Sequence, residues 1–177
     1  MIYSNSIVIT GVVEDAGLDR RDDYKRYFLV LKLDETNAEK VVDAIVEATD
    51  LGFANSKFSR DTKPYQLQFP LRGTTLGNFA NDGGNIFVST KLLPDIYLPD
   101  HTKMDESMVG RIRAGDTVEV ALDAYPYGNF DNGNNGIALK LLEIHVIEWS
   151  APVVKKYNLT LYDLIGPKDI KQDPLLQ

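Results

Sequence analysis

Hydrophobic and polar positions alternate along most of this chain, and alternation with a period of two is typical of β-strands that are buried on one face. The alternation is clearest in residues 24–33 (YKRYFLVLKL) and 85–91 (NIFVSTK), and β-branched residues favour a further strand in residues 2–13. Between the first two strands, residues 14–23 are charged and contain a glycine, so we expect a solvated loop there.

A long β-hairpin is predicted at residues 117–149, where two strand-like runs enclose a segment rich in glycine and asparagine. On the first run, valine and leucine occupy alternate positions, and the other series of positions continues into Tyr125 and Tyr127. Asn132-Gly133 and Asn135-Gly136 tolerate positive φ, so we expect the chain to reverse within this segment.

One amphipathic helix is predicted between the second and third strands. Thr36 and Glu39 have the spacing of a capping box, and apolar residues follow at helical spacing as far as Gly52, a plausible C-terminal stop. Residues 53–84 are expected to be mostly irregular, with a short strand at residues 65–71, and a loop of this length is usually functional. The predicted order is therefore β, β, α, irregular, β, β, β.

Length and composition place the chain among globular proteins. With 177 residues, of which 44% are hydrophobic and 25% charged, we expect one domain over residues 1–149 and a C-terminal extension over residues 150–177. No window approaches the ~18 apolar residues of a membrane span, and the N-terminus lacks the pattern of a signal peptide. We expect a soluble, unsecreted protein that does not associate with membranes.

Charge is distributed unevenly along the chain. The formal net charge of -7 argues against a polyanionic partner, because phosphates are bound chiefly by lysine and arginine. Residues 57–91, however, hold five lysines and arginines against two aspartates, whereas residues 34–50 hold one lysine against six acidic residues. The local electrostatic potential matters more to a ligand than the total charge. A positively charged region that binds a ligand is therefore compatible with this composition.

Catalytic and cofactor motifs are poorly supported. The chain has no cysteine and no G-x-S-x-G motif, and its two histidines, His101 and His145, are predicted in a loop and a strand without a serine or aspartate signature nearby. The glycines of residues 73–77 lack the following lysine of a phosphate loop, and residues 131–142 lack the final glutamate of a calcium loop. We expect neither an enzyme nor a bound metal or cofactor.

Aromatic and basic residues recur together on the outward strand faces and in the long loop. Single-stranded nucleic acids are bound by such surfaces, because bases stack on aromatic rings while phosphates meet cations. For any one residue a structural role is as good an interpretation, since Phe28 could cover a small second core and Tyr125 could close the end of a barrel. The candidate DNA-binding residues are Arg26, Phe28, Lys32, Lys57, Arg60, Lys63, Arg72, Phe87, Lys91, Tyr125, Tyr127, Phe130 and Lys140, with Phe58 and Tyr65 as further candidates in the loop.

Several segments resemble the phage single-stranded DNA-binding proteins that have an OB-fold. The similarity covers residues 27–146, and its elements are YFLVLKLD with the helix that follows, FPLRG, NIFVSTKLLPDIY, VGRIRAGDTVEVALDAYPY and GNNGIALKLLEIHVI. The resemblance implies a mostly β fold with one main helix, a five-stranded Greek-key barrel with long loops and a C-terminal extension. It also implies non-catalytic, largely sequence-independent binding of single-stranded DNA in phage replication, recombination or repair, in the cytoplasm of the bacterial host.

The same resemblance implies where DNA would bind. It places Lys32, Phe87, Lys91, Tyr125 and Tyr127 on the floor of a groove across the barrel. Phe130 and the loop of residues 57–72 would flank that groove.

The C-terminal extension departs from this family, in which several members end in an acidic tail that recruits replication proteins. Residues 150–177 instead hold four lysines against three aspartates. Phage replication proteins and a second copy of the chain remain candidate partners beside single-stranded DNA.

The main alternative is a structural or protein-binding β-barrel module of a phage particle or replication complex, which fits the negative charge and the acidic helix. Whether the cations of residues 57–91 converge on one groove or scatter would discriminate between the two interpretations.

Overall fold

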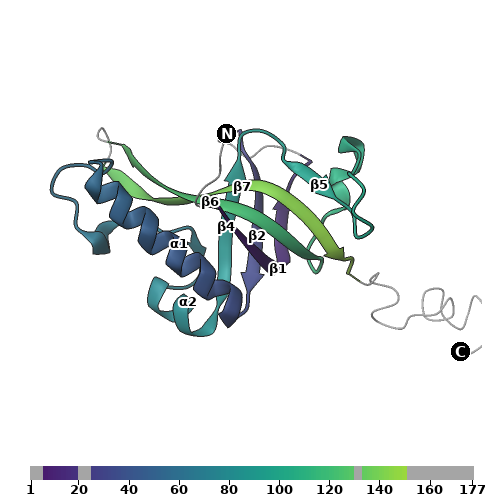
Figure 1. Ribbon diagram of the computed structural model, residues 1–177, viewed down its shortest axis with the longest axis horizontal. Helices are drawn as coiled ribbons and strands as arrows, with labels where there is room; N and C mark the ends of the chain where they lie inside the picture. Colours follow the sequence, from purple (N-terminus) through teal and green to yellow (C-terminus); the bar gives the residue numbers. More distant parts are fainter. Residues whose placement is uncertain (1–5, 20–24, 130–132, 151–177) are drawn as a thin grey trace, which may run out of the picture.

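The computed structural model describes residues 6–19, 25–129 and 133–150, and Figure 1 shows their arrangement. Its elements in chain order are β1 (Ser6–Gly17), β2 (Tyr27–Leu33), α1 (Glu35–Ala54), η1 (Pro64–Gln66), β3 (Leu71–Arg72), α2 (Leu76–Asp82), β4 (Gly84–Thr90), β5 (Asp95–Tyr97), η2 (Glu106–Arg111), β6 (Thr117–Asn129) and β7 (Asn134–Glu148). The predicted extension lies outside the described residues from position 151 onward.

Five of these strands close into a barrel. The sheet has the order β3-β4-β2-β1-β6-β7-β5, and an additional pairing of β4 with β7 joins the two sides into a ring. The neighbours in the ring are antiparallel except at the closure, where β4 and β7 are parallel and pair at one position, Ser89 with Lys140. The five-stranded OB-type barrel predicted from the sequence is therefore confirmed.

The barrel interior is filled by the alternate positions that the sequence pattern assigns to it. Leu29 and Leu31 of β2 are fully buried against Ile86 and Val88 of β4, and the alternate valines of β6 are buried as well. The intervening side chains, such as Phe28 and Phe87, lie on the outer face. The predicted inner and outer faces of these strands are confirmed, because a strand turns successive side chains to opposite sides.

Helix α1 begins and ends differently from the prediction. The side chain of Asp34 caps the helix by accepting a hydrogen bond from the backbone N–H of Asn37 at 2.9 Å, so the predicted Thr36–Glu39 capping box is wrong. The helix also continues through Gly52 to Ala54. Gly52 is required for packing rather than termination, because a Cβ there would lie 2.4 Å from the ring of Phe58.

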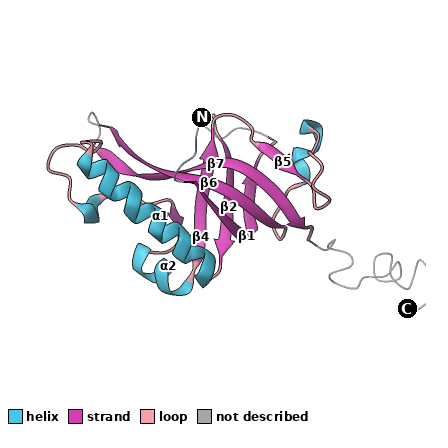
Figure 2. Cartoon of the chain, viewed as in Figure 1, coloured by secondary structure: helices cyan, strands magenta, loops and turns pink. Residues whose placement is uncertain are grey.

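The hairpin of β6 and β7 extends past the barrel, and α1 lies along its inner face (Figures 1 and 2). Pro126 on that face lies next to Gly52 of the helix. The chain does not reverse at Asn135-Gly136, as predicted, because Asn135 lies within β7 and pairs with Gly128. Gly133 is the first described residue after the reversal and has a φ of 71°. Asn132 lies outside the described residues.

Strand β1 ends later than predicted. It continues to Gly17 through a bulge at Glu14, so residues 14–17 are not part of a solvated loop. Residues 53–84 are likewise more ordered than expected, since they contain η1, β3 and α2. The strand predicted at residues 65–71 is reduced to the two residues of β3 and an isolated bridge between Gln68 and Gly136.

None of the helices in the described part of the chain has the length and hydrophobicity needed to cross a membrane.

Candidate nucleic-acid interface

A groove of about 890 Å³ lies where β4 and β7 separate beyond their single pairing position. The segment of residues 67–72 spans this separation. Gln68 is bonded to β7 on both sides, because its N–H donates to the carbonyl of Asn135 and its carbonyl accepts from the N–H of Ile137, both at 2.9 Å. Pro70 is tied to β4 in the same way, since its carbonyl accepts from the N–H of Phe87 at 2.9 Å. The groove therefore has a wall that is fixed at both ends.

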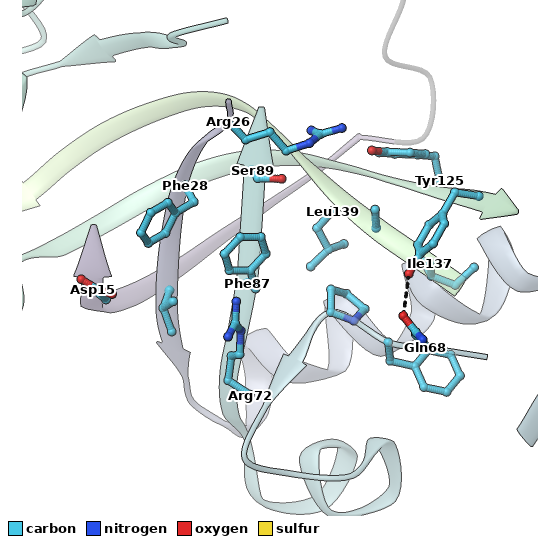
Figure 3. A pocket seen from close by; sticks show the side chains of 15 residues that line it. Asp15, Arg26, Phe28, Gln68, Arg72, Phe87, Ser89, Tyr125, Ile137 and Leu139 are labelled. Carbon is cyan, nitrogen blue, oxygen red and sulfur yellow. Dashed lines mark hydrogen bonds between the residues drawn. The ribbon is translucent and has the colours of Figure 1, made fainter. Parts of the chain in front are cut away.

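We call this hollow the first groove, and Figure 3 shows its lining. Side chains from β1, β2, β4, β6, β7 and the 67–72 segment contribute to it, together with Arg26 just before β2. It is lined by Asp15, Arg26, Phe28, Val30, Gln68, Phe69, Pro70, Arg72, Phe87, Ser89, Tyr125, Tyr127, Ile137, Ala138 and Leu139.

Two phenylalanines form the aromatic centre of the first groove. The rings of Phe28 and Phe87 stack with centroids 5.6 Å apart and planes inclined by 21°. Phe28 lies flat on the sheet because its neighbour across the strands is Gly17, where a Cβ would be only 2.1 Å from the ring. The guanidinium carbon of Arg72 lies 4.4 Å from the centre of the Phe87 ring, a cation–π contact.

Two tyrosines of β6 form the opposite side of the groove. Tyr127 faces Gly136 across the hairpin, where a Cβ would lie 2.8 Å from the tyrosine hydroxyl. That hydroxyl donates a hydrogen bond to Oε1 of Gln68 at 3.3 Å (Figure 3). Burial, together with the nearby Tyr125, raises the pKa of Tyr127, so its hydroxyl stays protonated and able to donate at neutral pH.

Two arginines give the first groove its positive charge. Arg26 reaches across the end of β4 toward Tyr125, and Arg72 lies at the other side of Phe87 (Figure 3). Asp15 is the one acidic residue among the lining residues. Flat rings flanked by guanidinium groups form a surface on which bases can stack while phosphates meet cations.

A second groove of about 810 Å³ adjoins the first. Arg26 and Tyr125 line both, so the two hollows share a boundary. It is lined by Arg26, Thr90, Lys91, Leu92, Leu93, Pro94, Asp95, Asp123, Tyr125, Lys140, Leu141 and Leu142.

The structure brings eight of the thirteen predicted site residues to these two grooves. Lys32 lies on the same outer face, in a cross-strand row with Asn85 and Arg72, but lines neither groove. The residues lining the first groove are Arg26, Phe28, Arg72, Phe87, Tyr125 and Tyr127; Lys91 and Lys140 line the second.

The cations of residues 57–91 are divided. Arg72 and Lys91 line the grooves, whereas Lys57, Arg60 and Lys63 are exposed on the segment after α1 and line neither.

The aromatic candidates of the loop differ from one another. Phe58 is a core residue, with 6% exposure and a ring 4.8 Å from that of Phe53, so its expected role on the surface is wrong. Tyr65 is 83% exposed but lines neither groove. Phe130 lies outside the described residues.

Apart from Arg72, sequence reasoning missed the groove-lining side chains of the 67–72 segment, above all Gln68 and Phe69, and the acidic Asp15. The FPLRG pattern was a signal for this segment, but its position between two separating strands depends on contacts with residues far along the chain. The sequence predicts a loop at Asp15, whereas the structure places this residue on the outer face of β1.

The histidines do not form a catalytic cleft with the grooves. Nε2 of His145 lies 2.7 Å from Oε2 of Glu143, and its ring stacks on Tyr97 with centroids 4.7 Å apart. Neither His145 nor Glu143 lines either groove, and His101 is exposed in a loop. Within the described residues, no group of three or more potential metal-binding side chains comes together.

No protein-family model matches the sequence, and no curated protein matches it in a sequence comparison. The single-stranded DNA-binding protein of bacteriophage Enc34, solved in complex with ssDNA, matches with a TM-score of 0.63 and 16% identity over 85% of this chain and 90% of that chain. The single-stranded DNA-binding protein gp2.5 of bacteriophage T7 matches with a TM-score of 0.64 and 15% identity over 85% of this chain and 96% of that chain. The chain therefore has the fold of these phage single-stranded DNA-binding proteins.

Proposed function

We propose that the protein binds single-stranded DNA in the first groove, largely independently of base sequence. The observation that carries this proposal is the stacked pair of Phe28 and Phe87 between Arg26 and Arg72. OB-folds bind oligonucleotides on the face of their second and third strands, between the loop after the first strand and the loop of the last hairpin. Strands β2 and β4 are the second and third strands of this barrel in chain order, so the aromatic pair occupies that face.

Stacking and charge would do different parts of the binding. Bases stack on the rings of Phe28, Phe87 and the two tyrosines, and every base has a face that can stack, so this contribution tolerates any sequence. Arg26 and Arg72 meet phosphates, which makes the affinity fall with salt because the release of counterions from DNA gains less free energy at a higher salt concentration. Gln68 supplies an amide at one wall, but a single amide discriminates weakly between bases.

The cellular role follows from the same chemistry. A non-catalytic protein that covers single strands would act in phage DNA replication, recombination or repair, in the cytoplasm of the bacterial host. The fold shared with phage single-stranded DNA-binding proteins supports this role. The alternative, a protein-binding barrel module, would cover the same aromatic pair with a protein partner, and the DNA titration below distinguishes the two.

A titration with fluorescent oligo-dT at several salt concentrations tests the proposal. Phe87→Ala should weaken binding by about 1–3 kcal/mol, roughly 5–150-fold in Kd, because one stacking surface is removed. Tyr65→Ala is the matched control, since it removes an exposed ring that lines neither groove and should leave the Kd unchanged. Circular dichroism checks that both variants fold. The absence of wild-type binding at low salt would refute the proposal.

A further inference from the structure

We propose that a longer single strand continues from the first groove into the second, so that the protein holds DNA in two sub-sites of different chemistry. The first groove would hold bases by stacking. The second would hold the next part of the strand mainly through its phosphates. This inference rests on the function proposed above and extends it to strands longer than the first groove can hold.

Continuity between the grooves is the first observation behind this inference. Arg26 and Tyr125 line both grooves, so the same arginine and the same aromatic ring are shared by the two. Ser89 lines the first groove and Lys140 the second, and these two residues form the pair that closes the barrel. The two grooves therefore adjoin at this closing pair, where we expect a strand of DNA to pass from one groove to the other.

The lining of the second groove differs in kind from that of the first. Among the described residues that line it, Tyr125 carries the one aromatic ring, whereas Lys91 and Lys140 both have exposed side chains. A lysine ammonium binds a phosphate as a point charge on a flexible stem, without a requirement for a fixed base position. Leu92 is 76% exposed and offers an apolar surface to a sugar or a base edge.

Two carboxylates in the second groove give the inference a sharper test. Asp95 lies 3.0 Å from the ammonium of Lys103, so its charge is already partnered. Asp123 is the cross-strand neighbour of Lys140 on β6 and lies on the same face, where it would repel a phosphate bound by that lysine. Removing the charge of Asp123 should therefore have the opposite effect from removing the lysine charges.

Oligo-dT of two lengths separates the sub-sites, for example about 6 and about 12 nucleotides, within the ~4–16 nucleotides that one OB-fold holds. The double variant Lys91→Gln with Lys140→Gln should bind the short strand like the wild type but lose affinity for the long one. For the long strand, the slope of log K against log salt should become shallower by about 1.4, or about 0.7 for each phosphate that a lysine no longer neutralises. Asp123→Asn should tighten binding of the long strand alone.

A control double variant distinguishes the loss of the second sub-site from a general loss of positive charge. Lys57→Gln with Lys63→Gln removes two exposed lysines that line neither groove, and should leave the difference between the two lengths as in the wild type. A long strand also gains affinity from its larger number of overlapping binding positions, so each variant is compared with the wild type at the same length.

The outcomes separate this inference from the proposed function. If the wild type binds the short strand, but the Lys91 and Lys140 variant weakens both lengths equally or neither, the second sub-site is refuted and the first groove stands. An unchanged or weaker affinity of Asp123→Asn for the long strand would refute it as well. If the wild type binds neither length at low salt, the proposed function fails and this inference fails with it.

Discussion

Replacing Gly17 with alanine should displace the ring of Phe28, although Gly17 itself lines neither groove. A Cβ at this position would lie 2.1, 2.6 and 2.8 Å from three carbons of that ring, and real Cβ atoms essentially never approach another atom closer than 3.0 Å. The ring must therefore move by about 1 Å or more away from the sheet. Such a movement disturbs the stack of Phe28 on Phe87, which is the centre of the first groove.

The expected loss of stability follows from two opposing contributions. Forcing extra volume into a well-packed core typically costs about 1–3 kcal/mol, which is an upper range here because the half-buried ring of Phe28 can move toward the groove. Alanine recovers about 0.5–1 kcal/mol, because glycine loses more conformational freedom on folding. Gly17→Ala should therefore lower the free energy of unfolding by at most roughly 2.5 kcal/mol. In a Phe28→Ala background the ring is absent, and the same substitution should stabilise the protein by about 0.5–1 kcal/mol.

Urea denaturation of the wild type, the two single variants and the double variant measures this change of sign as a coupling energy. Gly77→Ala is the matched control, because a Cβ on this glycine of α2 would meet no atom within 4 Å. It should be neutral or stabilise the helix by up to about 1 kcal/mol. In the oligo-dT titration Gly17→Ala should weaken binding and Gly77→Ala should not. If Gly17→Ala costs the same with and without the Phe28 ring, the reasoning is wrong.

Four further variants, at three residues, test individual contacts. Asn135→Ala should lower the free energy of unfolding in urea by about 1–3 kcal/mol, because the N–H of Ser59, now 2.9 Å from Oδ1 of Asn135, loses its acceptor; an unchanged urea midpoint would contradict this. Burial raises the pKa of Tyr127, so the contribution of the protonated side chain to stability is present at pH values below the ordinary pKa of 10.0. That contribution is lost as pH rises through the higher pKa of the folded state. Tyr127→Phe should reduce the fall in stability over that pH range. Hydrogen bonds from Asn37 lower the pKa of Asp34, so the stability that this helix cap contributes is present at pH values above the ordinary pKa of 3.8. It is lost as pH falls through the lower pKa of the folded state. Asp34→Ala should accordingly lower the urea midpoint at neutral pH but much less in strong acid, and Asp34→Asn should retain most of the capping.

Sequence alone predicts the strand faces well, because the alternation that defines them is local. The pattern around Phe28 assigns its ring to the outer face and Leu29 to the core, and the pattern around Phe87 does the same for that strand. Tyr125 and Tyr127 follow from the hairpin in the same way. These four rings line the first groove, so its aromatic character was predictable before its shape was known.

The contacts that shape the groove depend on residues far apart in the sequence. Asn135-Gly136 has the pattern of a turn, but the Asn135 side chain is bonded to Ser59, and Gly136 allows Gln68 and Tyr127 to approach the strand closely. These contacts stabilise an extended strand where local turn propensity predicts a reversal. The density of charge along the sequence does not predict which way each side chain points. Lys57 and Lys63 precede the 67–72 segment by only a few residues, yet they line neither groove.

The net charge of -7 also has a structural explanation that composition could not supply. The acidic residues of α1 are exposed, while its buried side packs against the inner face of the β6–β7 hairpin. The tyrosines of the first groove lie on the opposite face of that hairpin. A helix is about 10 Å in diameter, and the Debye length is about 8 Å at physiological salt, so the carboxylates on the far side of α1 are largely screened from a strand in the groove. The arginines that line the groove act at contact distance, where screening is weakest. For the proposed function, the distance between the acidic face of α1 and the arginines of the first groove matters more than the net charge of the protein.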